Sequence, residues 1–329
     1  MTMDLSRLIG KNFIAIGRAG MDLNTLTNQT IESSLSFQPS LGGSTANICA
    51  ALAKHGMNVT IATSVSDDAI GRFTVAQLQR FNVDTQYVKY VDGQARTSLA
   101  LVENRNEEQQ CIIYRNNAAD LMITIDEMES IDFGKYSGVI ATGTALAAEP
   151  SRSATLRAFE LAREANIPVI LDLDYRPYSW DSAEQATETY NRAVAFCDIV
   201  VGNDVEFGFL AGDYDKGMEC ARQLVENKAQ ITVYKMGPKG SCTFTKGAEF
   251  VTGIYKVEPL KPTGAGDAFL GGFLAALAEQ FPLDESIKRG SACASIVVTR
   301  PSCAPAMPTP IELEQFMASH LGPTNNFED

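Results

Sequence analysis

The order of short apolar runs along the chain is the feature that most limits its fold. Six runs rich in β-branched residues recur at 12–17, 59–65, 138–143, 169–174, 198–203 and 231–237. They do not alternate apolar with polar residues, which is typical of strands buried on both faces of a parallel sheet. Four segments with helical spacing lie between them, at 44–56, 150–166, 182–197 and 215–229. Strands that alternate with helices predict right-handed crossovers and a layered α/β sandwich with a mostly parallel central sheet.

Two segments interrupt this order, at 18–41 and 94–116. Each contains pieces in which apolar and polar residues alternate, such as IESSLSFQ, separated by polar turns without a helix. Period-two alternation favours strands with one exposed face. We therefore expect a small antiparallel flap that projects from the main sheet. Ordinary edge hairpins without a functional movement are the alternative.

Composition argues against several classes of protein. The chain has 329 residues, 45% of them hydrophobic, which is enough for one large core or two smaller ones. Its net charge of -13 argues against DNA, RNA or an anionic membrane surface as a partner. No run of about 18 apolar residues occurs, and the first residues lack the apolar core of an export signal. Seven cysteines without a CxxC pair indicate reduced thiols in the cytoplasm, and two histidines are too few for a multi-histidine metal site.

The stretch PTGAGDAFLGGF, at 262–273, carries the strongest chemical signal. Apolar residues recur every four positions after it, at 269, 273, 277 and 281, so a helix is expected to begin near the glycines. The first-turn N–H groups of a helix have no intrahelical acceptor, and the helix dipole favours negative charge there. We therefore expect an anion site at Gly264, Ala265 and Gly266.

Asp267 follows this anion site directly. A carboxylate repels a phosphate, so Asp267 is not expected to bind the anion itself. It has a use there if it accepts the proton of a hydroxyl that attacks the phosphate, as in a kinase. The alternative is that Asp267 caps the helix and the glycines only allow close packing.

A second glycine motif occurs near the amino end. LGGSTANICAALAKHG, at 41–56, places glycines before a helix with Asn47 in its first turn, and SVSDDAIGRF, at 64–73, places acids just after a strand. Ligands of open α/β sheets bind where such loops cluster, at the carboxyl ends of the strands. Neither GxxxxGK[ST] nor a GxGxxG after the first strand is present, which argues against a P-loop or an ordinary dinucleotide fold.

Together, these motifs resemble those of the ribokinase-like, or PfkB, family of ATP-dependent sugar kinases. The glycines at 42–43 and the GAGD at 264–267 match its two signatures in the correct order, and GNDVEF, at 202–207, matches its Asn-x-x-Glu element. The similarity covers roughly residues 12 to 320. It implies a three-layer α/β/α sandwich with one kinase domain over 1–322, in which the flap acts as a lid, followed by a polar tail at 323–329.

The resemblance also implies roles for individual residues. Asp267 would be the catalytic base, and Gly264, Ala265 and Gly266 would form the anion hole. Asn203 and Glu206 would organise Mg²⁺ around the ATP phosphates, indirectly through water.

Two further groups of residues follow from the same resemblance. The substrate hydroxyls would be held by Asp22, Gly42, Gly43 and Asn47. The nucleotide side would be formed by Lys235, Gly237, Gly240, Ala292 and Ser295.

Two arginines indicate the class of substrate. Arg115 in YRNNAADL and Arg176 in DLDYRPYSW stand where family members that act on sugar acids bind the carboxylate, and a guanidinium matches a carboxylate bidentately. The resemblance implies phosphorylation of the C6 hydroxyl of 5-dehydro-2-deoxygluconate in myo-inositol catabolism. The alternatives are a kinase of 2-keto-3-deoxygluconate, a nucleoside kinase and a non-catalytic sugar-acid-binding regulator. The resemblance also implies a homodimer through the flap, which IIY at 112–114 would support.

Lys261 departs from the family pattern. Many relatives carry an aspartate six residues before the catalytic base, where it helps to bind a monovalent cation. An ammonium group repels such a cation, so we predict that Lys261 replaces it and that activity does not depend on potassium. The alternative is that Lys261 points to solvent.

Overall fold

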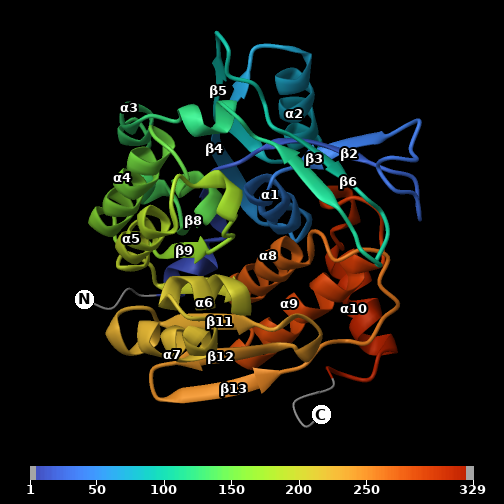
Figure 1. The fold of residues 1–329 in the computed structure, drawn as a ribbon. Coiled ribbons are helices and arrows are strands. Elements are labelled where there is room, and N and C mark those ends of the chain that lie inside the picture. The colour runs from blue at the N-terminus through green and yellow to red at the C-terminus, as the bar shows by residue number, and fades with distance from the viewer. Residues whose placement is uncertain (1–4, 324–329) are drawn as a thin grey trace.

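The computed structural model describes residues 5–323, so only the first residue of the polar tail expected at 323–329 lies within the described part. Figure 1 shows a large twisted sheet with helices on both faces and a smaller sheet beside it. The large sheet has nine strands, in the order β13 (Ala248–Thr252), β12 (Ser241–Thr245), β11 (Ile231–Lys235), β10 (Ile199–Asn203), β9 (Val169–Asp172), β8 (Gly138–Thr142), β1 (Asn12–Ile16), β4 (Asn58–Ser66) and β5 (Asp84–Val91).

The strands from β11 to β5 all run parallel, and β12 and β13 add an antiparallel hairpin at the edge. All six strands that the apolar runs predict are present, as β1, β4, β8, β9, β10 and β11. The reason is visible in β1. Phe13 and Ala15 pack into one hydrophobic cluster, and Ile14 and Ile16 pack into another on the opposite face. Because both faces are buried, the strand has no polar side to alternate with.

Helices cover each face of the sheet, so the expected three layers are confirmed. One face carries α3 (Ile125–Glu129), α4 (Ser151–Glu164), α5 (Ala183–Val194), α6 (Asp204–Ala211) and α7 (Gly217–Asn227). The other carries α1 (Ser44–Lys54), α2 (Ala69–Arg80), α8 (Ala265–Ala278) and α9 (Leu283–Val298), with α10 (Pro310–Ser319) packed against α9.

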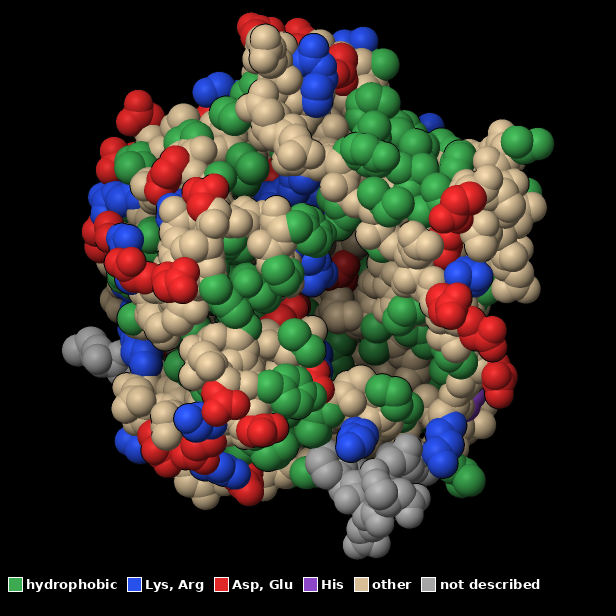
Figure 2. Space-filling view, in the orientation of Figure 1, with side chains coloured by type: hydrophobic (Ala, Val, Ile, Leu, Met, Phe, Trp, Pro, Cys, Tyr) green, Lys and Arg blue, Asp and Glu red, His purple; other side chains and the backbone are tan. Residues whose placement is uncertain are grey.

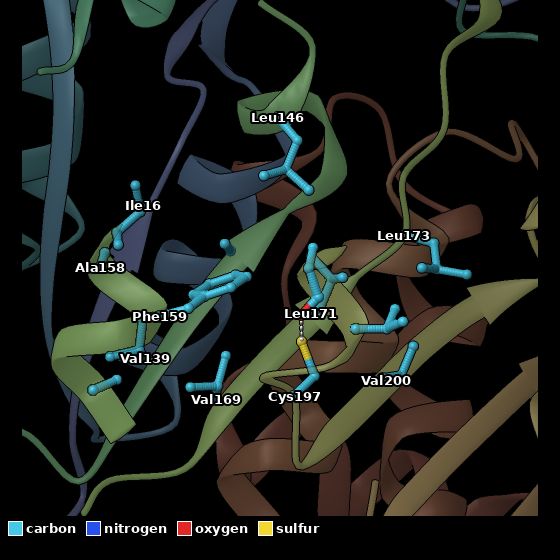
Figure 3. Close-up of a cluster of buried hydrophobic side chains, with 14 of the residues drawn as sticks. Ile16, Val139, Leu146, Ala158, Phe159, Val169, Leu171, Leu173, Cys197 and Val200 are labelled. Carbon is cyan, nitrogen blue, oxygen red and sulfur yellow. Dashed lines mark hydrogen bonds between the residues drawn. The ribbon is translucent and has the colours of Figure 1, made fainter. Parts of the chain in front are cut away.

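Figure 3 shows part of the first face, where Phe159 of α4 packs over side chains of the central strands. Its neighbours include Ile16, Val139 and Val169, and all four side chains are fully buried. Burial of apolar area on this scale is what holds the layers together. Among the described residues, no helix combines the length and the apolarity needed to cross a membrane.

The smaller sheet has four strands, in the order β3 (Gln38–Gly42), β2 (Gly20–Asn24), β6 (Leu99–Val102) and β7 (Cys111–Tyr114). We call this sheet and its connecting loops the lid. Its outer pairs are antiparallel as expected, but the central pair, β2 with β6, runs parallel, which corrects the expectation of an antiparallel flap. The lid consists of two hairpins that follow β1 and β5. Since β1 and β5 point the same way in the main sheet, the first strands of the two hairpins also run in the same direction.

Candidate active site

A cavity of about 510 Å³ lies between the lid and the carboxyl ends of the main-sheet strands. Figure 2 shows the molecule hollowed at the centre of this face, with basic and acidic side chains at the walls. Eleven residues that the sequence analysis singles out line it, namely Asp22, Gly43, Asn47, Arg115, Arg176, Asn203, Glu206, Lys235, Gly264, Gly266 and Asp267. Chain segments far apart in sequence therefore meet in one place.

Some predicted residues do not line this cavity. Gly42 packs directly against the Asp22 carboxylate, and Ala265 is the first residue of α8. Gly237 and Gly240 form the turn between β11 and β12. Ala292 and Ser295 lie in α9, where the Ser295 hydroxyl donates to the Tyr255 carbonyl at 3.1 Å. The nucleotide-side role of these last four residues stays a prediction.

Helix α8 begins at the glycine motif, as predicted. Its N-cap is Gly264, which has a φ of 87° and makes no side-chain cap. A Cβ at this position would lie 2.9 Å from Cys303 Sγ, so both the backbone conformation and the space require glycine. Asp267 lies in the first turn and is not the cap, which excludes the purely capping interpretation. The Ala265 amide donates to the Pro262 carbonyl at 3.4 Å, whereas the amides of Gly266 and Asp267 have no backbone acceptor among the described residues and can meet an anion.

Asp267 is held by a residue from the other glycine motif. Asn47 Nδ2 of α1 donates to Asp267 Oδ2 at 2.8 Å across 220 positions of sequence. Burial raises the pKa of Asp267 to about 8, and Asp174 and Asp172 add to the rise, whereas the Asn47 hydrogen bond and Lys235 oppose it. In its ionised form, a carboxylate with this raised pKa is a stronger proton acceptor than an ordinary aspartate, which suits a general base.

Charged side chains gather at the ends of β9, β10 and β11. Arg176 Nη2 lies 2.7 Å from Asp174 Oδ1, and its Nη1 lies 3.9 Å from Glu206 Oε1. Lys235 Nζ lies 3.8 Å from Asp172 Oδ2. A Cβ on Gly266 would lie 3.2 Å from Lys235 Nζ, so this ammonium group adjoins the expected anion hole.

The sequence analysis did not single out Asp172 and Asp174, although both line the cavity. The available signal was the pair of carboxylates in LDLD, at the end of a strand that is otherwise entirely apolar. Burial raises the pKa of Asp172. Acids in such a position lie at the edge of the sheet where ligands of α/β folds bind.

The Asn-x-x-Glu element is a capping box at the start of α6. Asn203 Oδ1 accepts from the Glu206 amide at 2.9 Å, and Glu206 Oε2 accepts from the Asn203 amide at 2.8 Å. Burial, aided by Asp172, raises the pKa of Glu206 to about 7. No group of three or more potential metal ligands occurs within the described residues.

The lid contributes Asp22 from β2. Burial raises the pKa of Asp22 to about 6, against the opposing effect of Arg18 and Lys261. A Cβ on Gly42 would lie 1.9 Å from Asp22 Oδ1, so the glycine of the neighbouring strand makes the space that this carboxylate occupies. Gly43 has a φ of 98°, and a Cβ there would lie 2.5 Å from the Arg18 carbonyl oxygen.

Arg115 is nearly buried and forms an ion pair with Asp120. Its Nη2 also donates to the Thr144 carbonyl at 2.9 Å. These contacts leave Nη1 without a hydrogen-bond partner among the described residues. One side of the guanidinium is therefore fixed, and the other is free to donate to a ligand.

Lys261 is fully buried, which contradicts the alternative of a solvent-exposed side chain. Its Nζ donates to the carbonyl of Thr263 in the loop just before the anion hole. Burial lowers the pKa of Lys261, whereas Cys303, Asp22 and Asp267 oppose that effect. The Lys261 amino group thus contacts the loop that leads into the expected anion hole, and replacement of the cation by Lys261 stays a prediction.

Comparison with known proteins connects this geometry to a family. The model of the pfkB family carbohydrate kinases matches residues 11–310. The chain belongs to the pfkB family of carbohydrate kinases. Among curated family members, the 5-dehydro-2-deoxygluconokinase of Geobacillus kaustophilus is 36% identical over 315 residues, which are 94% of each chain.

Solved structures agree on the pfkB fold. A fructokinase double mutant from Vibrio cholerae, bound to fructose, ADP and potassium, has a TM-score of 0.82 at 25% identity and covers 93% of this chain and 98% of its own. An aminoimidazole riboside kinase from Salmonella enterica, in complex with aminoimidazole riboside and an ATP analogue, has a TM-score of 0.79 at 24% identity, with 94% and 100% covered. The chain therefore has the ribokinase-like fold that its motifs predict.

Proposed function

We propose that this protein is an ATP-dependent sugar-acid kinase that phosphorylates the C6 hydroxyl of 5-dehydro-2-deoxygluconate, the substrate named in its curated relatives. The observation that carries the proposal is the meeting of three features in one cavity. These are the base Asp267, the anion-binding start of α8, and Arg115 with an unused donor. Asp267 would accept the proton of the attacking hydroxyl, the start of α8 would bind the transferred phosphoryl group, and Arg115 would bind the substrate carboxylate.

In the proposed reaction, Asp267 accepts the proton of the C6 hydroxyl as that oxygen attacks the γ-phosphorus of ATP. The first amides of α8 and the Lys235 ammonium group stabilise negative charge on the transferred group. Mg²⁺, held through water by Asn203 and Glu206, would neutralise charge on the phosphates. Closure of the lid would limit access of water, which otherwise competes with the sugar as acceptor.

We also propose how the whole protein works in the cell. Residues 1–322 would act as one kinase domain, with the lid segments at 18–41 and 94–116, in the cytoplasm and without nucleic-acid or membrane partners. Two copies would form a homodimer through the lid. Support comes from the apolar edge of β7, where Ile112 is 41% and Tyr114 is 59% exposed.

A coupled ADP-release assay tests the function. Purified protein with Mg²⁺ and ATP is given 5-dehydro-2-deoxygluconate, 2-keto-3-deoxygluconate, fructose, ribose or adenosine. We expect the highest kcat/KM on the first acid, and a fall of about 100- to 10,000-fold in kcat for Asp267→Ala. Asp284→Ala, at an exposed acid in the first turn of α9, is the matched control.

Each other outcome changes the conclusion. Preference for 2-keto-3-deoxygluconate would keep the mechanism and change the substrate, and preference for adenosine would indicate a nucleoside kinase. Binding of a sugar acid without turnover of any acceptor would overturn the proposed activity in favour of a non-catalytic regulator.

A further inference from the structure

Arg18 is a cavity-lining residue to which the sequence analysis assigns no role. It follows β1 at the carboxyl edge of the sheet, and its backbone is fixed, because its carbonyl accepts from the Ala46 amide at 3.2 Å. Gly43 packs against the same carbonyl, so closely that no side chain fits there. The chain thus holds the start of this side chain firmly beside the first turn of α1.

The guanidinium of Arg18 is only partly satisfied. Its Nε donates to Ser98 Oγ at 2.9 Å, across 80 positions of sequence. The side chain is buried, with the residue only 7% exposed, yet Nη2 has no hydrogen-bond partner among the described residues. A buried N–H donor without a partner costs free energy, more so on a charged group. The hydrogen bond to Ser98 fixes the plane of the guanidinium and leaves that donor unused.

Charge balance separates Arg18 from the other two arginines of the cavity. Arg115 is paired with Asp120, and Arg176 with Asp174. No ion pair joins Arg18 to an acid among the described residues, although its charge acts on buried Asp22, whose pKa it lowers against the effect of burial. A buried cation is stable only with a counter-anion. Among these arginines, Arg18 is the one that the protein leaves without such a partner.

We infer that Arg18 binds the carboxylate of the sugar acid together with Arg115, and that it is a specificity-determining residue that separates acids from neutral sugars. Among the described residues, Arg18 Nη2 and Arg115 Nη1 are the buried guanidinium nitrogens of the cavity that have no hydrogen-bond partner. Both arginines are anchored on their other side, so a bound carboxylate would meet donors that are already oriented. Arg176, whose charge Asp174 and Glu206 neutralise, would then help to position the phosphates. This inference rests on the proposed function.

A pair of ligands isolates the carboxylate. D-Gluconate and D-glucitol differ only at one carbon, which is a carboxylate in the first and a hydroxymethyl group in the second. Isothermal titration with each ligand is done for the parent protein, Arg18→Met and Arg18→Lys. We expect Arg18→Met to weaken gluconate binding about 10- to 100-fold and to change glucitol binding less than about threefold. Arg18→Lys should recover only part of the loss, because an ammonium group lacks the planar fork.

Kinetics give an independent result. With 5-dehydro-2-deoxygluconate, Arg18→Met should raise KM by a similar factor and change kcat little, because binding and not the chemical step is affected. Ser98→Ala, which removes the anchor of Nε, should raise KM about three- to tenfold and tests the inference if Arg18→Met fails to fold. Arg72→Met is the control, at an arginine whose side chain is 62% exposed.

The two hypotheses fail in different ways. If the parent protein phosphorylates no sugar acid, the proposed function is wrong. If the parent is active and Arg18→Met loses affinity for gluconate and glucitol equally, or for neither, Arg18 does not read the carboxylate and the inference is overturned.

Discussion

At the scale of single residues, the cavity is notable for acids whose environment opposes ionisation. Asp267, Glu206 and Asp22 all have a raised pKa, in each case chiefly through burial. The pKa of Asp267 departs furthest from its ordinary value; burial is the largest cause, and repulsion from Asp174 and Asp172 adds to it. A base in such a site is strongly proton-accepting, and the folded protein bears the cost of its charge.

The pKa of Asp267 predicts a pH dependence. Only the ionised carboxylate accepts a proton, so kcat/KM should rise with pH and level off above about 8. Asn47→Ala removes a hydrogen bond that lowers the pKa of Asp267. The rise of kcat/KM should therefore occur at higher pH in this variant. The measurement is a pH–rate profile of each variant at saturating ATP. If kcat/KM rises over the same pH range in Asn47→Ala as in the parent, a group other than Asp267 causes the rise.

The same carboxyl group links stability to pH. The pKa of Asp267 is higher in the folded state than its ordinary value of 3.8, so its stabilising contribution is complete below about pH 4 and is lost as pH rises through about 8. Asp267→Asn should therefore be more stable than the parent at pH 8.5, with a smaller difference at pH 5. Thermal unfolding at the two pH values measures this, with exposed Asp284→Asn as control.

Lys261 supplies a prediction about ions. Because its buried ammonium group donates to the Thr263 carbonyl, activity should be equal in potassium and in potassium-free Tris buffer. Lys261→Met should lower kcat about tenfold or more while stability is kept or increased, since burial of the charge opposes folding. Exposed Lys246→Met is the control. A several-fold stimulation of the parent by potassium would contradict cation replacement.

At the scale of elements, the lid is tied to the anion-hole loop. Gln109, in the β6–β7 loop, places its Nε2 2.6 Å from Thr263 Oγ1, and the Thr263 carbonyl is held from below by Lys261. The β6–β7 loop is itself ordered by buried Glu103, whose carboxylate pairs with Arg105 at 2.8 Å and accepts a hydrogen bond from the Gln110 amide at 3.0 Å. The lid thereby contacts the loop that leads into the expected phosphate site.

This contact predicts coupling between lid and chemistry. Gln109→Ala and Thr263→Val should each reduce kcat/KM, and together they should cost less than the sum, with a coupling of about 0.5–1.5 kcal/mol. Thr263→Ser keeps the hydroxyl and should remain close to the parent. Gln110→Ala, at the exposed neighbouring glutamine, is the matched control. Strict additivity of the two changes would show that the contact does not couple the segments.

At the scale of the whole molecule, the two hairpins of the lid form the wall opposite the strand ends. Strand β7 is the edge of that wall. Its Cys111 and Ile113 line the cavity, and the alternation of a strand directs Ile112 and Tyr114 to the other side. An exposed apolar edge strand favours pairing with another chain.

The homodimer proposal follows from this edge. In sedimentation velocity, the parent should have about twice the chain mass of 35.6 kDa, and the double variant Ile112→Lys with Tyr114→Lys should sediment as a monomer. Tyr214→Lys, at a tyrosine of similar exposure beside α6, should leave the mass unchanged. A parent protein that sediments as a monomer at micromolar concentration would refute the dimer.

Local patterns in the sequence determined most of the elements. The six apolar runs became strands and the GAGD glycines became the start of α8, because both outcomes depend on neighbouring residues and on burial of whole faces. The Asn-x-x-Glu element likewise forms its capping box within four residues. The resemblance to pfkB kinases rested on these local motifs, and the comparison with the family confirms it.

The tertiary structure alone decided how distant groups meet. The hydrogen bond from Asn47 to Asp267, the anchoring of Arg18 by Ser98 and the burial of Lys261 join positions that no local pattern relates. The parallel pairing of β2 with β6 also depends on the direction of the main sheet. The pKa of a carboxyl group and the pairing of a guanidinium depend on burial and on neighbours in space. Sequence therefore determined which groups are present, and folding decided which of them are charged, paired or left free for a ligand.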